Sequence, residues 1–165
     1  MKKNNRQELG WALGLMLLPV LYAVWAYQKL PDSLAIHFDL SGKGNAFLPK
    51  FIVVSALPIA MMLLEVIIYW TSMSKALLDT TFKHFVRWIV PFSFVSIYLA
   101  TIYRGLNENF DIRKMAFLLV GLVFLFVGNY LPKKVQEGRA PLDRRLAYIF
   151  VVFGFLLFIV AIFCL

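Results

Sequence analysis

The stretch FIVVSALPIAMMLLEVIIYWT (residues 51–71) decides the fold class, because it is almost continuously apolar and carries a single charged residue. A helix needs about 20 such residues to cross the hydrocarbon core of a bilayer. The rest of the chain has the same character: 61% of its 165 residues are hydrophobic, and the mean hydropathy is +0.76. A soluble domain of this size cannot bury so much apolar surface. The sequence therefore predicts a membrane protein.

Five apolar segments approach the length of a membrane span, and together they predict an all-α, polytopic transmembrane helix bundle. They lie near residues 9–28, 51–71, 85–103, 115–131 and 146–165. The first is longer than the core of a signal peptide, and no A-x-A site follows it closely, so we expect it to be retained. The third and fourth are shorter, which leaves a four-span alternative with one of them re-entrant or interfacial. Residues 1–165 are expected to form one integral-membrane domain in the lipid bilayer.

The net charge of +8 comes from basic residues that flank the apolar segments. They form no stripe with interleaved aromatic residues, so direct binding of nucleic acid is not expected. Basic residues accumulate in the cytoplasmic loops of membrane proteins. Eleven lie in the N-terminal tail and the second and fourth loop regions, against six in the first and third. We therefore expect a cytoplasmic N-terminus, a C-terminus outside, and an outward-facing loop at residues 30–50.

The loop PKKVQEGRAPLDRR (residues 132–145) contributes most to this asymmetry. Its basic side chains are Lys133, Lys134, Arg139, Arg144 and Arg145. We interpret it as a solvated cytoplasmic loop, which topology alone explains. Clustered basic residues also bind anionic lipid headgroups, and a docked protein partner is a third interpretation.

Glu65 and Asn129 are the candidate functional residues among the polar side chains of the predicted spans. A charge at the position of Glu65 costs a few kcal/mol, so its side chain should face the bundle and find a partner. It is either a ligand, ion or proton site, or a residue hydrated near the cytoplasmic interface. The candidate partners are Lys75, His84 and Arg87. Asn129 follows Gly128, which permits close helix approach, and we expect the amide to hydrogen-bond a neighbouring helix.

The stretch LPDSLAIHFDLSGKGNAFLPK (residues 30–50) is polar and rich in turn residues. Its His37, Asp32 and Asp39 are residue types that bind zinc, and a water on such a metal can act as a nucleophile. Three potential ligands in a short loop, without a second histidine nearby, do not make a matched ligand set. The alternative interpretation is structural: Asp32 caps a short helix through SLAIHF. A turn through Ser41, Gly42, Gly44 and Asn45 would follow, with the glycines adopting angles that other residues resist.

The same stretch resembles the domain DUF1648 of SdpI-like bacterial membrane proteins, in which a loop of the type L-P-x-x-I-P-x-H-F-x-x-x-G-x-x-[DN]-x-x-x-x-K joins two spans. The matching residues are Leu30, Pro31, His37, Phe38, Gly42, Asn45 and Lys50. Ala35 replaces the second proline of the pattern. The resemblance covers residues 10–70. A weaker SdpI-like resemblance covers residues 115–145, through GNYLPK (residues 128–133) and, loosely, Gly138, Arg139 and Pro141.

The resemblance implies a protein of the bacterial cytoplasmic membrane. Its implied role is immunity to a secreted, membrane-active toxin or peptide, with signal transduction through sequestration of a cytoplasmic repressor. The candidate recognition residues are then Pro31, Asp32, His37, Phe38, Asp39, Gly42, Asn45 and Lys50.

Known catalytic motifs offer no alternative, because the chain has no G-x-S-x-G, no phosphate-binding glycine loop and no paired carboxylates within a span. We expect no enzymatic activity and no cofactor. The second hypothesis is a small transporter or channel component whose path is lined by Glu65. The third is a membrane metalloenzyme that uses His37, Asp32 and Asp39.

Overall fold

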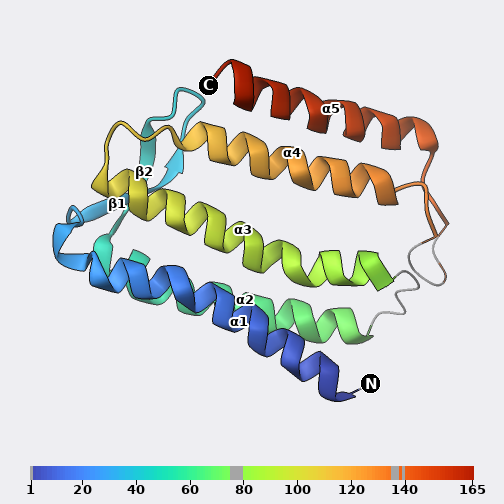
Figure 1. The fold of residues 1–165 in the computed structure, drawn as a ribbon, viewed down its shortest axis with the longest axis horizontal. Helices are drawn as coiled ribbons and strands as arrows, with labels where there is room; N and C mark the ends of the chain where they lie inside the picture. The colour runs from blue at the N-terminus through green and yellow to red at the C-terminus, as the bar shows by residue number, and fades with distance from the viewer. Residues whose placement is uncertain (1, 75–79, 135–137, 139) are drawn as a thin grey trace.

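The computed structural model describes residues 2–74, 80–134, 138 and 140–165, and in these parts the chain forms five long helices (Figure 1). They are α1 (Lys2–Trp25), α2 (Leu57–Ser74), α3 (Thr80–Leu106), α4 (Ile112–Tyr130) and α5 (Arg144–Phe163). Each contains a segment that is long and apolar enough to cross a membrane. The predicted helix bundle is confirmed, with five spans rather than four. Lys75 and Arg139 lie outside the described residues.

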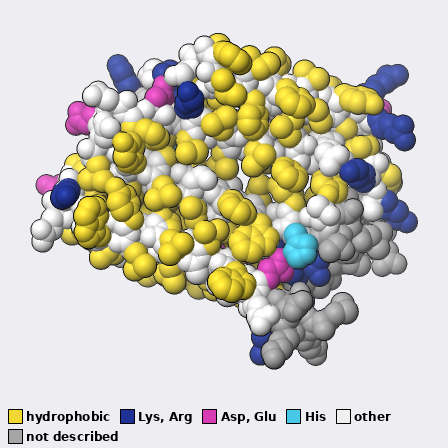
Figure 2. Space-filling model, in the orientation of Figure 1, with side chains coloured by type: hydrophobic (Ala, Val, Ile, Leu, Met, Phe, Trp, Pro, Cys, Tyr) yellow, Lys and Arg dark blue, Asp and Glu magenta, His cyan; other side chains and the backbone are white. Residues whose placement is uncertain are grey.

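The helices lie side by side, so the bundle has two ends (Figure 1). The N-terminus and the start of α5 lie at one end, which we call the N-terminal end. The C-terminus, a two-stranded hairpin and the connection between α3 and α4 lie at the other, the hairpin end. Charged side chains gather at both ends of the visible face, and hydrophobic side chains cover the band between them (Figure 2). This distribution fits a multi-pass membrane protein.

The hairpin corrects one prediction, because SLAIHF is a strand rather than a short helix capped by Asp32. Strand β1 (Ser33–Phe38) pairs antiparallel with β2 (Gly44–Pro49), with Leu34 opposite Leu48. Leu34 is buried between exposed or half-buried neighbours, and β2 supplies the backbone partners that a helix would have provided internally. Gly44 and Asn45 consequently belong to β2 rather than to the turn.

The main core lies between α1, α2, α3 and the hairpin. Its fully buried side chains include Met16 and Ala23 of α1, Val53 before α2, and Ile102 of α3. Residues Ile52–Ala56 form a π-helical turn directly before Pro58. Proline has no backbone N–H to donate, and the wider turn accommodates this missing bond.

Helices α4 and α5 pack closely through glycines. A Cβ atom at Gly128 would lie 2.8 Å from Val151 Cγ2 and 3.0 Å from the carbonyl oxygen of Ala147. The close approach predicted at Gly128 is therefore confirmed. The expected interhelical bond of Asn129 is wrong: its side chain is exposed, and its oxygen accepts a 3.1 Å bond from Lys133. Successive helical residues point about 100° apart, so the helix that turns Gly128 inward turns Asn129 outward.

Candidate functional site

The base of the hairpin is held by Lys50. Its backbone N–H donates to the Asp32 carbonyl oxygen at 2.9 Å, and its ammonium lies 3.1 Å from the Asp32 carboxylate. The ammonium also donates to the Leu30 carbonyl oxygen at 3.3 Å and lies 5.3 Å from the centre of the Tyr27 ring. These contacts join the start of β1 to the end of β2. Asp32 and Lys50 therefore have a structural reason to occur together in this loop.

Asp39 shapes the tip of the hairpin. Its Oδ1 accepts hydrogen bonds from the Ser41 hydroxyl at 2.6 Å, the Ser41 N–H at 2.8 Å and the Lys43 N–H at 2.9 Å. The bonds from Ser41 and Lys43 hold the pKa of the Asp39 carboxyl below its usual value. Gly42 has a φ of +79°, and a Cβ there would meet the Arg113 side chain of α4 at 3.1 Å. Glycine is favoured here by its backbone angle, and its lack of a side chain leaves room for Arg113 of α4.

His37 pairs with Asn45 across the hairpin, where His37 Nδ1 lies 2.5 Å from Asn45 Oδ1. A carbonyl oxygen only accepts, so the imidazole donates from Nδ1, and Nε2 of the neutral ring is left as an acceptor. The structure thus brings together two motif residues that are eight positions apart. Both side chains are exposed.

The hairpin is docked on α3 through Leu34, which is only 1% exposed. Gly105 of α3 provides the space, because a Cβ atom there would overlap the Leu34 side chain. On the α4 side, Arg113 binds Asp111 in a two-pronged pair and donates at 3.4 Å to the Leu40 carbonyl oxygen. The same pair lowers the pKa of Asp111. The hairpin is therefore fixed to two helices.

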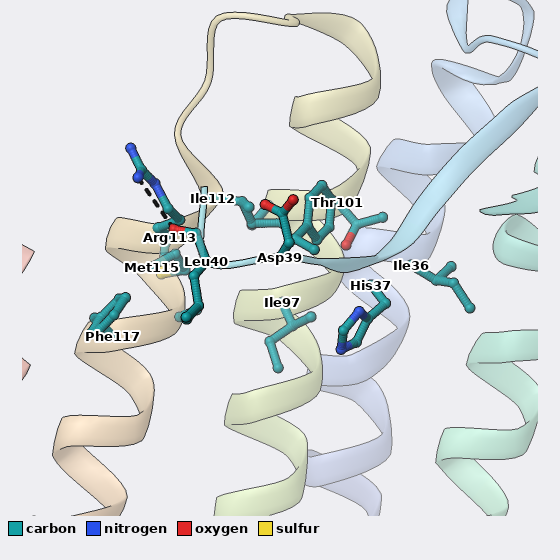
Figure 3. Close-up of a pocket in the computed structure, with 13 residues that line it drawn as sticks. Ile36, His37, Asp39, Leu40, Ile97, Thr101, Ile112, Arg113, Met115 and Phe117 are labelled. Carbon is teal, nitrogen blue, oxygen red and sulfur yellow. Dashed lines mark hydrogen bonds between the residues drawn. The ribbon is translucent and has the colours of Figure 1, made fainter. Parts of the chain in front are cut away.

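A pocket of about 340 Å³ lies between the hairpin and helices α3 and α4 (Figure 3). Its lining is mainly apolar and includes Ile36, Phe38, Leu40, Ile97, Met115 and Phe117. The polar groups at its border are His37, Asp39, Thr101 and Arg113. In Figure 3 the imidazole of His37 and the side chain of Ile97 extend to one side of the β1 backbone, and Asp39 extends to the other. A hydrophobic ligand with one hydrogen-bonding group would match this lining.

The predicted metal candidates are not brought together. Asp32 is paired with Lys50, and Asp39 is used by the turn at the tip. Within the described ranges, no group of three His, Cys, Asp or Glu side chains is placed to hold a metal ion. The residues around His37 therefore do not fit a metal site in this arrangement.

A second polar cluster lies near the N-terminal end, where α1, α2 and α3 meet. Glu8 of α1 accepts hydrogen bonds from Arg87 Nη1 at 2.6 Å and from Trp88 Nε1 at 3.2 Å. Nδ1 of His84 lies 2.7 Å from Oε1 of the Glu8 carboxylate. Arg87 is 2% exposed, whereas the His84 side chain is 56% exposed. Residues 84, 87 and 88 share one face of α3, which places all three donors around a single carboxylate.

Glu65 belongs to the same cluster through α2. Tyr69 and Ser72 follow it on one helix face, and both contact Arg87. Arg87 Nε donates to Ser72 Oγ at 3.1 Å, and the guanidinium lies 4.7 Å from the centre of the Tyr69 ring. Glu65 itself is 0% exposed. Of its predicted partners, Arg87 lies in this cluster, His84 binds Glu8 instead, and Lys75 lies outside the described residues.

Sequence reasoning missed Glu8, because the first span was placed from residue 9 and α1 begins at Lys2. It likewise placed His84 just before the third span, which the structure extends back to Thr80. One signal was present: Glu8 is the single acidic residue among the first 31. The partners of Glu8 were also visible in the sequence, as His84 and Arg87, which lie three positions apart near the start of α3.

The basic loop lies at the N-terminal end. Lys133 lies over the Tyr130 ring at 4.6 Å, and Lys134, Arg144 and Arg145 are exposed. The Asp143 carboxylate accepts a 2.9 Å bond from the Arg145 N–H and caps α5. The loop therefore presents exposed positive charge on either side of its undescribed residues.

Comparisons with known proteins give one family match. No curated protein and no solved structure matches the chain. The matching family model covers residues 14–62, from the middle of α1 through the complete hairpin into α2. This segment contains His37, Asn45 and Lys50, whose contacts define the hairpin. Residues 14–62 match DUF1648, a domain of unknown function.

Proposed function

We propose that this chain is an SdpI-like, multi-pass protein of the bacterial cytoplasmic membrane that recognises a secreted, membrane-active toxin or peptide and protects the cell from it. The observation that carries the proposal is the hairpin pocket, which is apolar, open and bordered by His37. The DUF1648 match over residues 14–62 supports it, because this segment contains the whole hairpin. The proposed role is recognition and requires no enzymatic step.

The pocket suits a peptide that approaches within the membrane surface. Apolar side chains such as Ile97 and Phe117 would bury an apolar side chain of the ligand. The free acceptor on the His37 imidazole would receive a hydrogen bond from a ligand N–H or O–H. Because the hairpin is fixed to α3 and α4, little conformational freedom would be lost on binding.

The proposed orientation places the hairpin outside and the N-terminus in the cytoplasm. Exposed Lys134, Arg144 and Arg145 lie at the N-terminal end, and cytoplasmic loops carry the excess of basic residues. The C-terminus then lies outside with the hairpin (Figure 1). Cysteine-labelling of intact cells at Lys43→Cys and Lys134→Cys, with Cys164 replaced by Ser, would check this. Labelling of residue 134 but not residue 43 by an impermeant reagent would refute the orientation.

The immunity role is tested by expressing the chain in a toxin-sensitive strain. Ala116→Trp places a large ring in the pocket lining, whereas Val120→Trp places the same ring one helical turn away, at an exposed position outside the lining. We expect protection by the wild type and Val120→Trp, and its loss in Ala116→Trp and His37→Ala. Survival of wild-type cells no better than with an empty vector would exclude immunity to that toxin.

A cytoplasmic partner would complete the signalling version of this role. The exposed basic residues of the 132–145 loop would attract an acidic surface of a repressor. We expect Lys134→Glu with Arg144→Glu to release such a partner from the membrane fraction, and Lys114→Glu at the hairpin end to leave it bound. Equal retention by both variants would count against recruitment through this loop.

A further inference from the structure

Glu65 is a fully buried carboxyl group inside a membrane-spanning helix. Its side chain is 0% exposed, and neither of its oxygens has a hydrogen-bond partner within the described part of the chain. An ionised carboxylate at membrane depth is strongly unfavourable unless a cation or hydrogen-bond donors neutralise it. The group therefore needs either a proton or a cation.

The permanent cation of this cluster, Arg87, is already bound to another carboxylate. Arg87 Nη1 donates to Glu8 Oε2 at 2.6 Å, which is a charge-assisted bond of the strong type. From the α2 side, Ser72 accepts a hydrogen bond from Arg87 Nε, and the Tyr69 ring lies against the guanidinium. Glu65 lies on the face of α2 that carries Tyr69 and Ser72, so it faces the side of the bundle where Arg87 binds Glu8. Two carboxyl groups thus share the influence of one guanidinium.

Charge balance then identifies the ligand of this site. With Glu8 and Glu65 both ionised and the His84 imidazole neutral, the described residues of the cluster carry one negative charge more than Arg87 neutralises. We propose that Glu65 is a reversible proton-binding site in the membrane interior and that its ionised form competes with Glu8 for Arg87. The inference is independent of the hairpin and of the immunity role.

The competition links the proton to helix packing. When Glu65 is protonated, Arg87 of α3 is held by Glu8 of α1. When Glu65 loses its proton, the added negative charge on α2 draws the guanidinium away from α1. The titratable and charged groups around the site are Glu8 from α1, Tyr69 from α2, and His84 and Arg87 from α3. His84 is the most exposed of them, so it connects the cluster to water.

Infrared spectroscopy of the protein in liposomes tests the proton directly. A protonated carboxyl group has a carbonyl stretch that an ionised carboxylate lacks, and the band shifts on exchange into D₂O. In the wild type at neutral pH we expect one such band from a buried group. This measurement needs no variant, and absence of the band would overturn the proposal.

Two substitutions then test the assignment and the competition. Glu65→Gln should remove the band, and Glu8→Gln should also remove it, because a neutral amide at position 8 no longer competes by charge for Arg87, whose guanidinium then stabilises ionised Glu65. Glu108→Gln, at an exposed position between α3 and α4, should leave the band unchanged. A band that persists in folded Glu65→Gln overturns the site. A band that persists in folded Glu8→Gln overturns the competition for Arg87, because a merely structural Glu8 would leave the band unchanged.

Discussion

The docking of the hairpin on α3 makes a quantitative prediction, because one side chain fills the space above one glycine. Leu34→Ala removes a fully buried side chain, which costs about 2–5 kcal/mol in well-packed proteins. If this contact holds the hairpin in place, the backbone amides of the hairpin should exchange with solvent roughly 30-fold faster or more. The factor follows because each ~1.4 kcal/mol of lost stability raises the exchange rate tenfold. Hydrogen exchange of residues 33–49, measured by mass spectrometry in detergent, gives this ratio.

The matching change on α3 tests the same contact from the other side. Gly105→Ala would place a Cβ atom within the Leu34 side chain, an overpacking that costs about 1–3 kcal/mol. In the Leu34→Ala background the clash is gone, so the alanine should be neutral or should stabilise the helix by up to ~1 kcal/mol. The two substitutions must therefore be strongly non-additive. Equal acceleration of exchange by Gly105→Ala in both backgrounds would refute the docking contact.

Other features of the structure give further predictions. Gly128→Leu should weaken the α4–α5 contact by about 1–3 kcal/mol and lower the thermal midpoint, whereas Gly10→Leu, with open space around it, should not. His37→Ala and Asn45→Ala should loosen the hairpin by similar amounts without adding in the double variant, as read by exchange of residues 33–49. Hydrogen bonds depress the pKa of Asp39, so its stabilisation of the turn is complete above the usual value of 3.8 and is lost as pH falls through the lowered pKa. NMR shifts of the Ser41 and Lys43 amides, which donate to the Asp39 carboxylate, should follow that loss in the wild type. The same amides in Asp39→Asn should show no such dependence on pH.

The five spans were predictable because burial in lipid depends on local composition, which a single sequence displays. The ends of the helices were less predictable from the sequence. α1 begins seven residues before the predicted span, and α3 five residues before it, because polar residues continue a helix when other helices satisfy them. Glu8 does this by accepting from Arg87 and Trp88. The place of Glu8 in the cluster with Glu65, His84 and Arg87 was missed for the same reason.

The hairpin was misinterpreted because strand pairing is non-local. The residues of SLAIHF do not by themselves indicate that the strand pairs with GNAFLP. A polar residue after a proline is also a common helix cap. By contrast, the turn at Gly42 was predictable, since its left-handed angle is a local property. The resemblance to DUF1648 identified His37 and Asn45 as a pattern, and the structure supplies the physical reason, a hydrogen bond between them.

The Glu8–Arg87 pair joins residues that are 79 positions apart, and this separation has a consequence for assembly in the membrane. Chains are synthesised from the N-terminus, so α1 and α2 leave the ribosome before their shared cation exists. Until α3 arrives, Glu8 must stay near the headgroups or carry a proton, and Glu65 must carry one as well. Insertion of α3 at the correct depth then completes the pair. A bundle that lacks its third span therefore also lacks this ion pair.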